Sequence, residues 1–520
     1  MNKKIFTFLL AVAFFLIAAF HFQLNLVKRS QPPSNEWSKE VLISTGNILG
    51  NPALLRYKDN YVVIHSDKNK IKIVALDKMA VKLNEKSFSA KGSEPMNTVA
   101  LTDGTYYYAY WLVSEDGNKS LYGIKLDEKF NLIEEFSEEG QGLYEIVTVG
   151  ENILALNYGN KITVNNLATG IKYDIPCADA EFLTSAKNKT GYIASFKERK
   201  GDIKYFSIKD NTLSEVQTAV ELGNISSITY VSAIMTADDN FAYMLMEYRS
   251  KGEYGGTKEI KIPLTSKEKA TMDEFRIDKS KASISNIVPY YEEGQAKFLA
   301  SKEVPYDKKR SYDNIVEYNI TSKGEFVQVS RTKDLSMFPS GTQDTVVFCD
   351  VVDKDKFNVY MASKDKKFIQ LHGNQRLSEI KLALIDTISG ILFSIVYIIP
   401  YGALWVIPII GIVSIYSVFE YKLTSKNKKI WFMLIYFSFF VFKSLGIRFV
   451  SFKRFGYYLP QFMTLGVSLL VSLAISLLCG VFTYIKYSKG VEHNMVATDL
   501  FMPIVYDTIL TLMVFVPFMV

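Results

Sequence analysis

Four ionisable side chains lie inside long apolar stretches of the chain, where a charge has chemical consequences. Asp386 is near the start of one stretch, Lys443 and Arg448 lie in the outer half of the next, and Asp507 is well inside the last. A charge among lipid chains is costly, so such residues usually mark ion pairs, ion pathways or proton relays. We therefore take these four residues as the intramembrane site candidates.

The four candidates differ in how easily they can reach water. Long basic side chains can extend their charged ends to the membrane surface, and we expect Lys443 and Arg448 to do so. The short side chain of Asp507 has less room to escape. We predict that Asp507 either pairs with Lys443 or faces a polar cavity, and that replacing it by Leu impairs folding or activity.

The sequence contains no motif that indicates catalysis or metal binding. The four histidines are scattered and no Cys-x-x-Cys occurs, so neither a zinc site nor a histidine-based triad is supported. No Gly-x-Ser-x-Gly is present, and the Ser-x-x-Lys matches at 266–269 and 363–366 lie in lysine-rich loops. We expect no catalytic residue, no metal and no cofactor. A non-enzymatic protein is favoured over an enzyme, and no binding residue is assigned.

Composition divides the chain into unlike parts. Residues 36–375 are rich in Lys, Asp, Glu, Asn, Gly and Tyr, whereas residues 380–520 are dominated by Ile, Leu, Val and Phe. The net charge of +6 contains no long block of like charge, so a nucleic-acid partner is not expected. Cys177 and Cys349 fall in the polar part, where two unpaired buried thiols are favoured over one bridge.

The first 30 residues have the pattern of an export signal. Lys3 and Lys4 precede an apolar run from Ile5 to Phe22, and no small-x-small cleavage site follows it. We predict an uncleaved signal anchor that spans the membrane, with cleavage as the alternative. Its basic start favours a cytoplasmic N-terminus, which places the polar part outside the cytoplasm.

The C-terminal part contains four apolar stretches, at about 382–421, 430–450, 459–486 and 498–520. The first is too long for one straight helix and is interrupted by Pro400, Gly402, Pro408 and Gly411. It either crosses the membrane once after a lateral helix or crosses twice. One crossing places six lysines in the cytoplasm and four basic residues outside, so we predict five spans in all and an outside C-terminus. The six lysines are Lys422, Lys426, Lys428, Lys429, Lys486 and Lys489, and the four are Lys443, Arg448, Lys453 and Arg454.

Residues 36–375 contain a recurring pair of strands. A turn precedes a short aromatic or β-branched strand, a polar loop follows, and a second strand ends before the next turn. About seven copies occur, and their second strands lie roughly 40–60 residues apart, which is the interval of a four-stranded propeller blade. The paired segments are 61–64 with 71–76, 106–111 with 121–126, 153–156 with 162–167, 191–196 with 203–208, 241–246 with 259–262, 296–300 with 315–320, and 345–348 with 357–361.

This spacing predicts an all-β, propeller-like soluble domain of about seven blades, joined to an α-helical transmembrane bundle. A two-sheet sandwich of this length would be very large, and six or eight blades stay open. The pattern resembles that of bacterial membrane-anchored β-propeller-repeat proteins, without a signature of any one family. The predicted parts are an anchor at 1–30, an extracytoplasmic propeller at 36–375 and a polytopic helical domain at 380–520.

Two features of the polar part receive structural interpretations. Along 106–111, alternation puts Tyr106, Tyr108 and Tyr110 on one face and Tyr107 and Trp111 on the other, so we expect a strand packed between blades. An aromatic platform for a sugar is the alternative. Adjacent carboxylates at 138–139, 238–239 and 292–293 point apart and are expected in solvated loops.

These observations favour a membrane protein whose propeller binds or senses something at the outer cell surface. Its expected partners are the lipid bilayer and a protein of the membrane or envelope. A transport or insertion machine, with an active helical core and a regulatory propeller, is the alternative; its topology resembles that of membrane insertases and some export permeases. An outward-facing hydrolase is a third option. The sequence leaves the ligand, the partner and the oligomeric state open.

Overall fold

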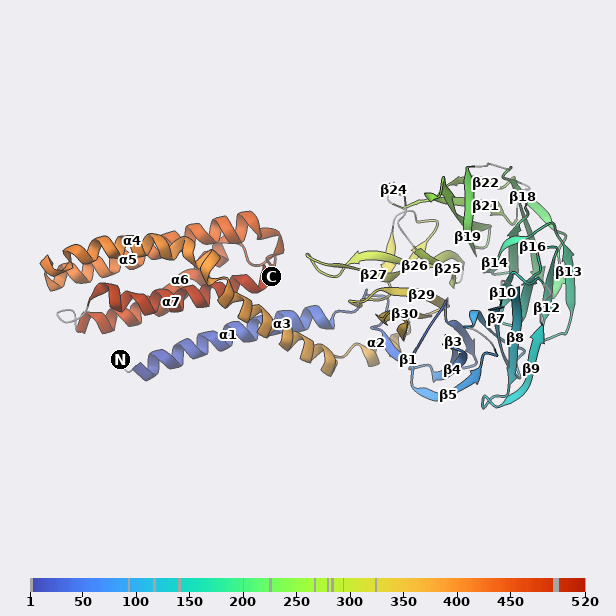
Figure 1. Cartoon of the computed structure of the whole chain (residues 1–520), viewed down its shortest axis with the longest axis horizontal. Coiled ribbons are helices and arrows are strands. Elements are labelled where there is room, and N and C mark those ends of the chain that lie inside the picture. Colours follow the sequence, from blue (N-terminus) through green and yellow to red (C-terminus); the bar gives the residue numbers. More distant parts are fainter. Residues whose placement is uncertain are drawn as a thin grey trace. The chain divides into compact units, whose positions relative to one another are not determined.

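The chain divides into two compact units, Pro32–Asn374 and a second unit of Met1–Gln31 with Gln375–Val520 (Figure 1). The N-terminal helix therefore belongs to the same unit as the C-terminal helices. The computed structural model describes all residues except 1–2, 92–93, 116–117, 139–141, 200, 224–226, 266–267, 278–279, 282–284, 293, 323–324, 490–494 and 520.

The unit Pro32–Asn374 is built from seven antiparallel sheets that form the blades of a propeller. Six sheets have four strands and the fourth blade has five. The first blade contains β2(Ala53–Tyr57), β3(Asn60–Asp67), β4(Lys70–Asp77) and β5(Lys82–Ser89). The second contains β6(Met96–Thr102), β7(Tyr107–Glu115), β8(Asn118–Leu126) and β9(Leu132–Glu138). The third contains β10(Glu145–Gly150), β11(Ile153–Asn157), β12(Lys161–Asn166) and β13(Lys172–Pro176). The fourth and fifth are β14(Glu181–Asn188), β15(Gly191–Lys197), β16(Asp202–Lys209), β17(Thr212–Leu213) and β18(Gln217–Glu221); and β19(Ile228–Ala237), β20(Phe241–Ser250), β21(Glu253–Pro263) and β22(Thr271–Glu274). The last two are β25(Ser285–Glu292), β26(Gln295–Pro305), β27(Ser311–Asn319) and β28(Phe326–Gln328); and β29(Ser336–Thr342), β30(Thr345–Asp353) and β31(Lys356–Ser363), completed by β1(Val41–Gly46). A separate pair, β23(Arg276–Ile277) with β24(Ser280–Lys281), precedes the sixth blade.

The first strand of each blade lies at the centre of the ring. In order, β2, β6, β10, β14, β19, β25 and β29 each contact the next, and β29 contacts β2. The ring is closed by β1, which comes from the start of the unit and pairs antiparallel with β31 from its end, with Val41 opposite Met361. The predicted propeller of about seven blades is therefore confirmed, and its blade number is seven.

Turn residues explain how the first two strands of a blade are joined. In the second blade, Asp103 accepts hydrogen bonds from the backbone N–H groups of Thr105 and Tyr106. In the fifth blade, Asp238 accepts from the corresponding groups of Asn240 and Phe241. An aspartate that bonds the backbone two residues on stabilises a tight turn, so Asp238 is a turn residue rather than a freely solvated one.

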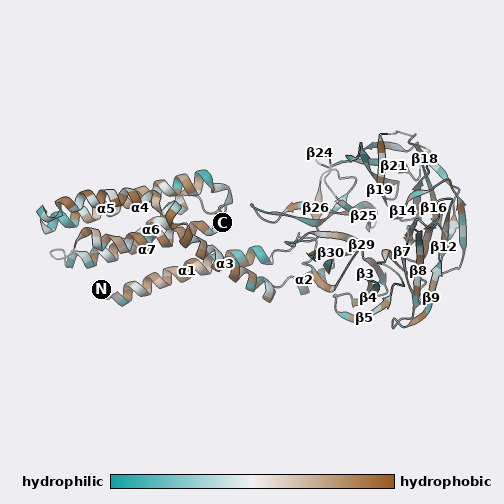
Figure 2. Ribbon diagram, viewed as in Figure 1, coloured by the Kyte–Doolittle hydropathy of each residue, from teal (hydrophilic) through white to brown (hydrophobic). Residues whose placement is uncertain are grey.

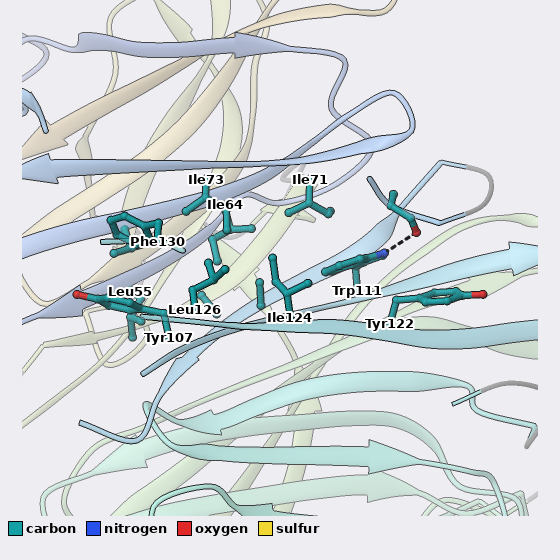
Figure 3. Packing of buried hydrophobic residues seen from close by; sticks show 14 of the residues in the cluster. Leu55, Ile64, Ile71, Ile73, Tyr107, Trp111, Tyr122, Ile124, Leu126 and Phe130 are labelled. Atoms are coloured by element: carbon teal, nitrogen blue, oxygen red, sulfur yellow. Dashed lines mark hydrogen bonds between the residues drawn. The ribbon is translucent and has the colours of Figure 1, made fainter. Parts of the chain in front are cut away.

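Apolar layers between neighbouring blades form the core. Tyr107 and Trp111 pack with Ile64, Ile71 and Ile73 of the first blade, and the indole N–H of Trp111 donates to the carbonyl of Ala90 (Figure 3). On the other face of the same strand, Tyr108 and Tyr110 pack with the third blade. The prediction that this strand is packed between blades is confirmed, because both of its aromatic faces are buried.

The second unit consists of helices rich in hydrophobic residues (Figure 2), many of which are exposed. Its main helices are α1(Lys3–Ser30), α3(Leu377–Val396), α4(Ala403–Phe419), α5(Ser425–Gly446), α6(Leu465–Lys489) and α7(Val496–Phe515). Short π and 3-10 segments join or extend them, namely η1(Ile398–Gly402), η2(Glu420–Lys422), η3(Ile447–Arg454), η4(Gly456–Tyr458) and η5(Val516–Phe518). A short helix, α2(Lys366–His372), ends the propeller unit.

The long apolar stretch at 382–421 is broken as its sequence predicts. The π segment η1 contains Pro400 and Gly402 and separates α3 from α4. Proline lacks the N–H of a regular helical hydrogen bond, so an interruption at this point is expected.

Five helical segments among the described residues are long and apolar enough to cross a membrane, the number that the sequence predicts. They are Lys4–Ser30, Ile398–Lys422, Ser425–Arg454, Leu465–Lys489 and Val496–Phe518. The ring of Phe6 lies 5.5 Å from that of Phe482 and 6.2 Å from that of Tyr506, whereas the ring of His21 lies 4.9 Å from that of Phe518. Helices α1 and α7 therefore run in the same direction. The ring of Phe20 lies 6.1 Å from that of Phe462, just before α6, so α6 runs against them.

The three cysteines are free, as the sequence favours, with Cys349 and Cys479 buried and Cys177 half-buried.

Candidate functional site

Three of the predicted intramembrane candidates have defined partners, and two of them meet. The ammonium of Lys443 on α5 lies 2.5 Å from Oδ1 of Asp507 on α7, and both side chains are fully buried. Pairing of Asp507 with Lys443 is one of the two arrangements that the sequence predicts. The functional role of these residues stays a prediction.

Hydroxyl groups from α5, α6 and α7 complete this ion pair. Lys443 also donates to Oγ of Ser476 at 2.6 Å and to the carbonyl of Ser472 at 3.1 Å. Asp507 accepts from Ser476 at 2.7 Å and from the Tyr436 hydroxyl at 3.0 Å through Oδ2, and from Thr511 at 3.1 Å through Oδ1. A buried ion pair is stable only where further hydrogen bonds satisfy both ions, and this cluster supplies them.

Small residues on α6 make room for the cluster. Ser468, Ser472, Ser476 and Gly480 recur every four residues and are all buried. A Cβ added at Gly480 would lie 2.3 Å from the ring of Tyr436, so this position requires glycine. This stripe is not among the sequence predictions above, although a four-residue spacing of small residues indicates close helix packing in membranes.

The expectation that Lys443 extends to the membrane surface is wrong. Its side chain is fully buried because Asp507 satisfies its charge inside the bundle. Arg448, in η3, is exposed, and its extension to the surface remains compatible with the structure.

Asp386 lies outside the Lys443–Asp507 cluster and has a partner of its own. Arg29 on α1 donates to both of its carboxylate oxygens, from Nε at 2.7 Å and from Nη2 at 2.8 Å. One and two turns before Arg29, Asn25 donates to the Thr387 hydroxyl and His21 bonds the Met513 carbonyl. These three polar residues recur every four positions and fasten the second half of α1 to α3 and α7. The four-residue spacing of His21, Asn25 and Arg29 is visible in the sequence.

The propeller has a cavity at its axis. It has a volume of about 200 Å³ and is lined by residues of six of the seven innermost strands, by Glu151 and Gln343 in the turns after two of them, and by Tyr192 of β15. Among the described residues that line it, Glu151 is the one carboxylate, and Lys187 lies 5.3 Å from the ring centre of Tyr291. Glu151, Lys187, Tyr192 and Tyr291 give the cavity a mixed charged and aromatic lining. The sequence did not predict it, because the strands that build it lie far apart along the chain.

A buried charged cluster lies beside the point where the propeller closes. Glu317, whose side chain is 2% exposed, accepts from Lys297 at 2.7 Å, from Lys364 at 2.9 Å and from the indole N–H of Trp37 at 3.1 Å. Glu292 accepts from the same two lysines. We call these five residues, Trp37, Glu292, Lys297, Glu317 and Lys364, the clasp.

The clasp overturns one expectation from sequence. Glu292 is expected from sequence in a solvated loop, but two lysines bind it. Its neighbour Glu293 lies outside the described residues, and so do Ser266 and His493. Burial raises the pKa of Glu292, yet hydrogen bonds from Lys297 and Lys364 outweigh burial and hold it below the usual value. Lys297 shows the reciprocal effect. Burial lowers its pKa, but the two glutamates have the larger effect, so the pKa of Lys297 lies above its usual value.

A second buried carboxylate in the propeller lacks such support. Asp350 on β30 is 1% exposed and accepts from Ser336 at 2.7 Å through Oδ1. Among the described residues Oδ2 has no hydrogen-bond partner. Burial raises the pKa of Asp350 to about 7, and the hydrogen bond from Ser336 offsets only part of the effect.

Comparison with known proteins identifies no family. No family model matches the chain, and no curated protein matches it. Similar solved structures include a complex of S. cerevisiae Dbp5 with Nup159, Gle1, IP6 and ADP, at 12% identity and a TM-score of 0.35, and the N-terminal domain of Nup159, at 12% identity and a TM-score of 0.36. Each match covers 64% of this chain and 96% of the other.

The structure therefore defines the class of protein through its own strand pairing and helices. The chain combines a seven-bladed β-propeller with a bundle in which five helical segments among the described residues are long and apolar enough to cross a membrane.

Proposed function

We propose that the propeller is a binding or sensing module at the outer surface of the cell membrane, and that the helical bundle anchors it and passes its state to a protein partner. The protein is non-enzymatic in this proposal. The observation that carries it is strand β25, whose successive residues face the axial cavity and the clasp in turn.

Strand geometry links the two sites directly. Pro289 and Tyr291 line the axial cavity, and Tyr290 between them points to the opposite side, as successive strand residues do. Tyr290 is buried against Trp37, with ring centres 6.3 Å apart, and Lys364 lies 5.6 Å from its ring. The Tyr290 hydroxyl also donates to the carbonyl of Gln343, which lines the cavity.

The clasp holds both chain segments that lead out of the propeller unit. Trp37 lies just after its first residue, Pro32, and Lys364 precedes the helix α2 that ends it. A ligand that binds one arrangement of Tyr291 and Gln343 more tightly than another shifts the population of that arrangement. Through Tyr290, the shift acts on the two segments that continue into the membrane helices.

The distribution of basic residues supports an outward-facing propeller. Lys443 is buried in an ion pair, so it no longer counts as a loop charge. Without Lys443, one end of the predicted spans carries six lysines and the other carries three basic residues instead of four. The larger number favours a cytoplasmic location for the end that carries Lys422, Lys426, Lys428, Lys429, Lys486 and Lys489.

The alternatives receive less support. A transport machine would be favoured by a water-lined path through Asp507 and Lys443, but both side chains are fully buried and bond each other and hydroxyl groups. A hydrolase would be favoured by convergent carboxylates at the propeller axis, where Glu151 is the one carboxylate among the described lining residues.

Co-purification from membranes tests the proposal. The purified full chain should retain the same protein or small ligand in every preparation. The amount of this ligand should fall about tenfold when Lys187→Glu or Tyr291→Ala alters the axial cavity, a loss typical of a central contact residue. Both side chains lie at the cavity rather than in the layers between blades, so the fold should persist.

Matched changes on the outer side of a blade provide the control. Lys129→Glu and Ile133→Ala alter exposed positions beside and on β9, and both should leave the yield unchanged. An equal loss in all four variants, or no loss in the cavity variants, would contradict binding at the axis.

A further inference from the structure

The helical bundle contains a large groove between the first half of α1 and helices α6 and α7. Its volume is about 980 Å³, at the upper end of the range for pockets that enclose small molecules. Its walls include Phe6, Leu10 and Phe14 of α1, Phe482 of α6, and Met502 and Leu510 of α7.

The way in which α1 is fastened explains why the groove exists. The second half of α1 is held by the Arg29–Asp386 ion pair and by the bond from His21 to the Met513 carbonyl. Near its start, the ring of Phe6 touches those of Phe482 and Tyr506. Leu10 and Phe14 lie between these two attachments and line open space.

Charge is concentrated at one end of the groove. Lys486 and Lys489 from the last turn of α6 line it there, together with Asp499 from the first turn of α7. Asp499 is 3.5 Å from Lys486, whose side chain is 77% exposed. Two ammonium groups face one carboxylate, so this end of the groove carries a net positive charge.

We propose that this groove binds one molecule of an anionic phospholipid. Its phosphate lies against Lys486 and Lys489, and an acyl chain runs along Leu10 and Leu510. The basic end and the apolar walls match the two halves of such a lipid, and a lysine near a membrane surface attracts anionic headgroups. A transmembrane helix of another protein would fill the walls without using the lysines. The proposal does not depend on the function of the propeller.

Lipid binding to the purified full chain tests the proposal. The chain in detergent is titrated with phosphatidylglycerol, which is anionic, or phosphatidylcholine, which has no net charge, and bound lipid is counted by native mass spectrometry. We expect one retained phosphatidylglycerol, bound roughly tenfold more tightly than phosphatidylcholine. The double variant Lys486→Ala/Lys489→Ala should remove this preference.

Changes to the apolar wall separate a groove site from loosely bound lipid. Leu10→Trp narrows the groove and should weaken retention of both lipids, whereas Leu16→Trp places the same residue at an exposed position of α1 outside it. Lys426→Ala/Lys428→Ala removes two lysines at the start of α5, outside the groove, and should change nothing.

Three outcomes would overturn the proposal. One is equal binding of the two lipids by the wild type, and another is retention unchanged by the lysine double variant. The third is a wild-type mass that shows a second copy or another protein in place of lipid. If Leu10→Trp fails to fold, as judged by circular dichroism, the lysine variant still decides the question.

Discussion

The two units of the chain each bury a charged cluster, and they complete it differently. In the bundle, Lys443 and Asp507 are both 0% exposed, and every oxygen of Asp507 accepts at least two hydrogen bonds. In the propeller, Glu317 is as deeply buried, but its partners Lys297 and Lys364 are 10% and 14% exposed and Glu292 is 35% exposed.

The proposed function offers a reason for the difference, because it places lipid around the bundle and water around the propeller. Lipid chains cannot bond a charged group, so an ion buried in such a bundle depends on the protein itself for its partners. Water at the edge of the propeller can complete a charged group that the protein leaves partly open. We infer that loss of one charge should be most damaging where neither water nor another side chain can replace it.

The largest effect is therefore expected for Asp507→Leu. This change leaves the Lys443 ammonium buried without its counter-ion, and breaking a buried pair in this way costs about 3–5 kcal/mol. We expect a lower yield of folded protein and a lower thermal midpoint of the helical circular dichroism signal in detergent.

A second substitution separates the lost pair from the altered shape of the side chain. Asp507→Leu combined with Lys443→Met removes both charges and should recover most of the stability, because replacing a whole buried pair by apolar residues is often neutral. Ser438→Ala is the control, because this half-buried residue of α5 bonds the Leu434 carbonyl and has no bond to the cluster among the described residues. A double variant as unstable as Asp507→Leu would show that the ion pair is not the reason for the loss.

The sequence predicts the middle strands of the blades better than the others. Its seven segment pairs correspond to the second and third strands of each blade, from β3 and β4 to β30 and β31. These strands are buried on both faces; all five residues of β11, for example, are buried. Such strands form continuous apolar runs that stand out from their surroundings.

The inner and outer strands give no comparable signal. Strand β5, Lys82–Ser89, alternates between exposed and half-buried positions and is mostly polar. Pairing of β1 with β31 joins residues more than 300 positions apart, and only the closed ring determines it. The axial cavity is hidden in the sequence for the same reason.

The candidate site was predictable in part. Asp507 stands out because an aspartate deep in an apolar run requires a partner, and Lys443 is a cation in a neighbouring run. Sequence could not show that Ser476, Tyr436 and Thr511 complete the pair, because hydroxyl groups are common in membrane helices. Without these bonds, extension of Lys443 to the surface was the better expectation.

A smaller effect is expected at Asp350, the propeller carboxylate with an unsatisfied oxygen. Its pKa is about 7 in the folded protein and near 3.8 in the unfolded chain. Between these two pH values the folded state holds a proton that the unfolded state has lost. The resulting stability is fully present below pH 3.8 and is lost as the pH rises through about 7. We expect Asp350→Asn, which resembles the protonated form, to stabilise the protein at pH 8 by on the order of 2 kcal/mol.

Denaturant unfolding at several pH values measures this effect. Between pH 4 and pH 7 the stability of the wild type should fall more steeply than that of Asp350→Asn, and the difference should be constant above that range. Asp353→Asn, at the exposed end of the same strand, should follow the wild type. Parallel pH profiles for the wild type and Asp350→Asn would contradict a raised pKa at this position.

The smallest effect is expected at the pair between Arg29 and Asp386, and it tests whether solvent access or the membrane unit itself decides the outcome. Asp386 is 36% exposed, so water can bond its carboxylate after Arg29→Gln removes the cation. We expect a loss of about 1 kcal/mol, the upper range for exposed pairs, measured as roughly fivefold faster hydrogen exchange of the amides in the second half of α1.

Lys381→Gln, exposed on α3, should leave the exchange unchanged. The exchanged pair Arg29→Asp/Asp386→Arg should restore slow exchange, since the same two charges then meet across the same helices. A loss as large as that of Asp507→Leu would mean that any charged pair in the bundle is essential, whatever its access to water, and would remove the contrast between the sealed cluster and the open one.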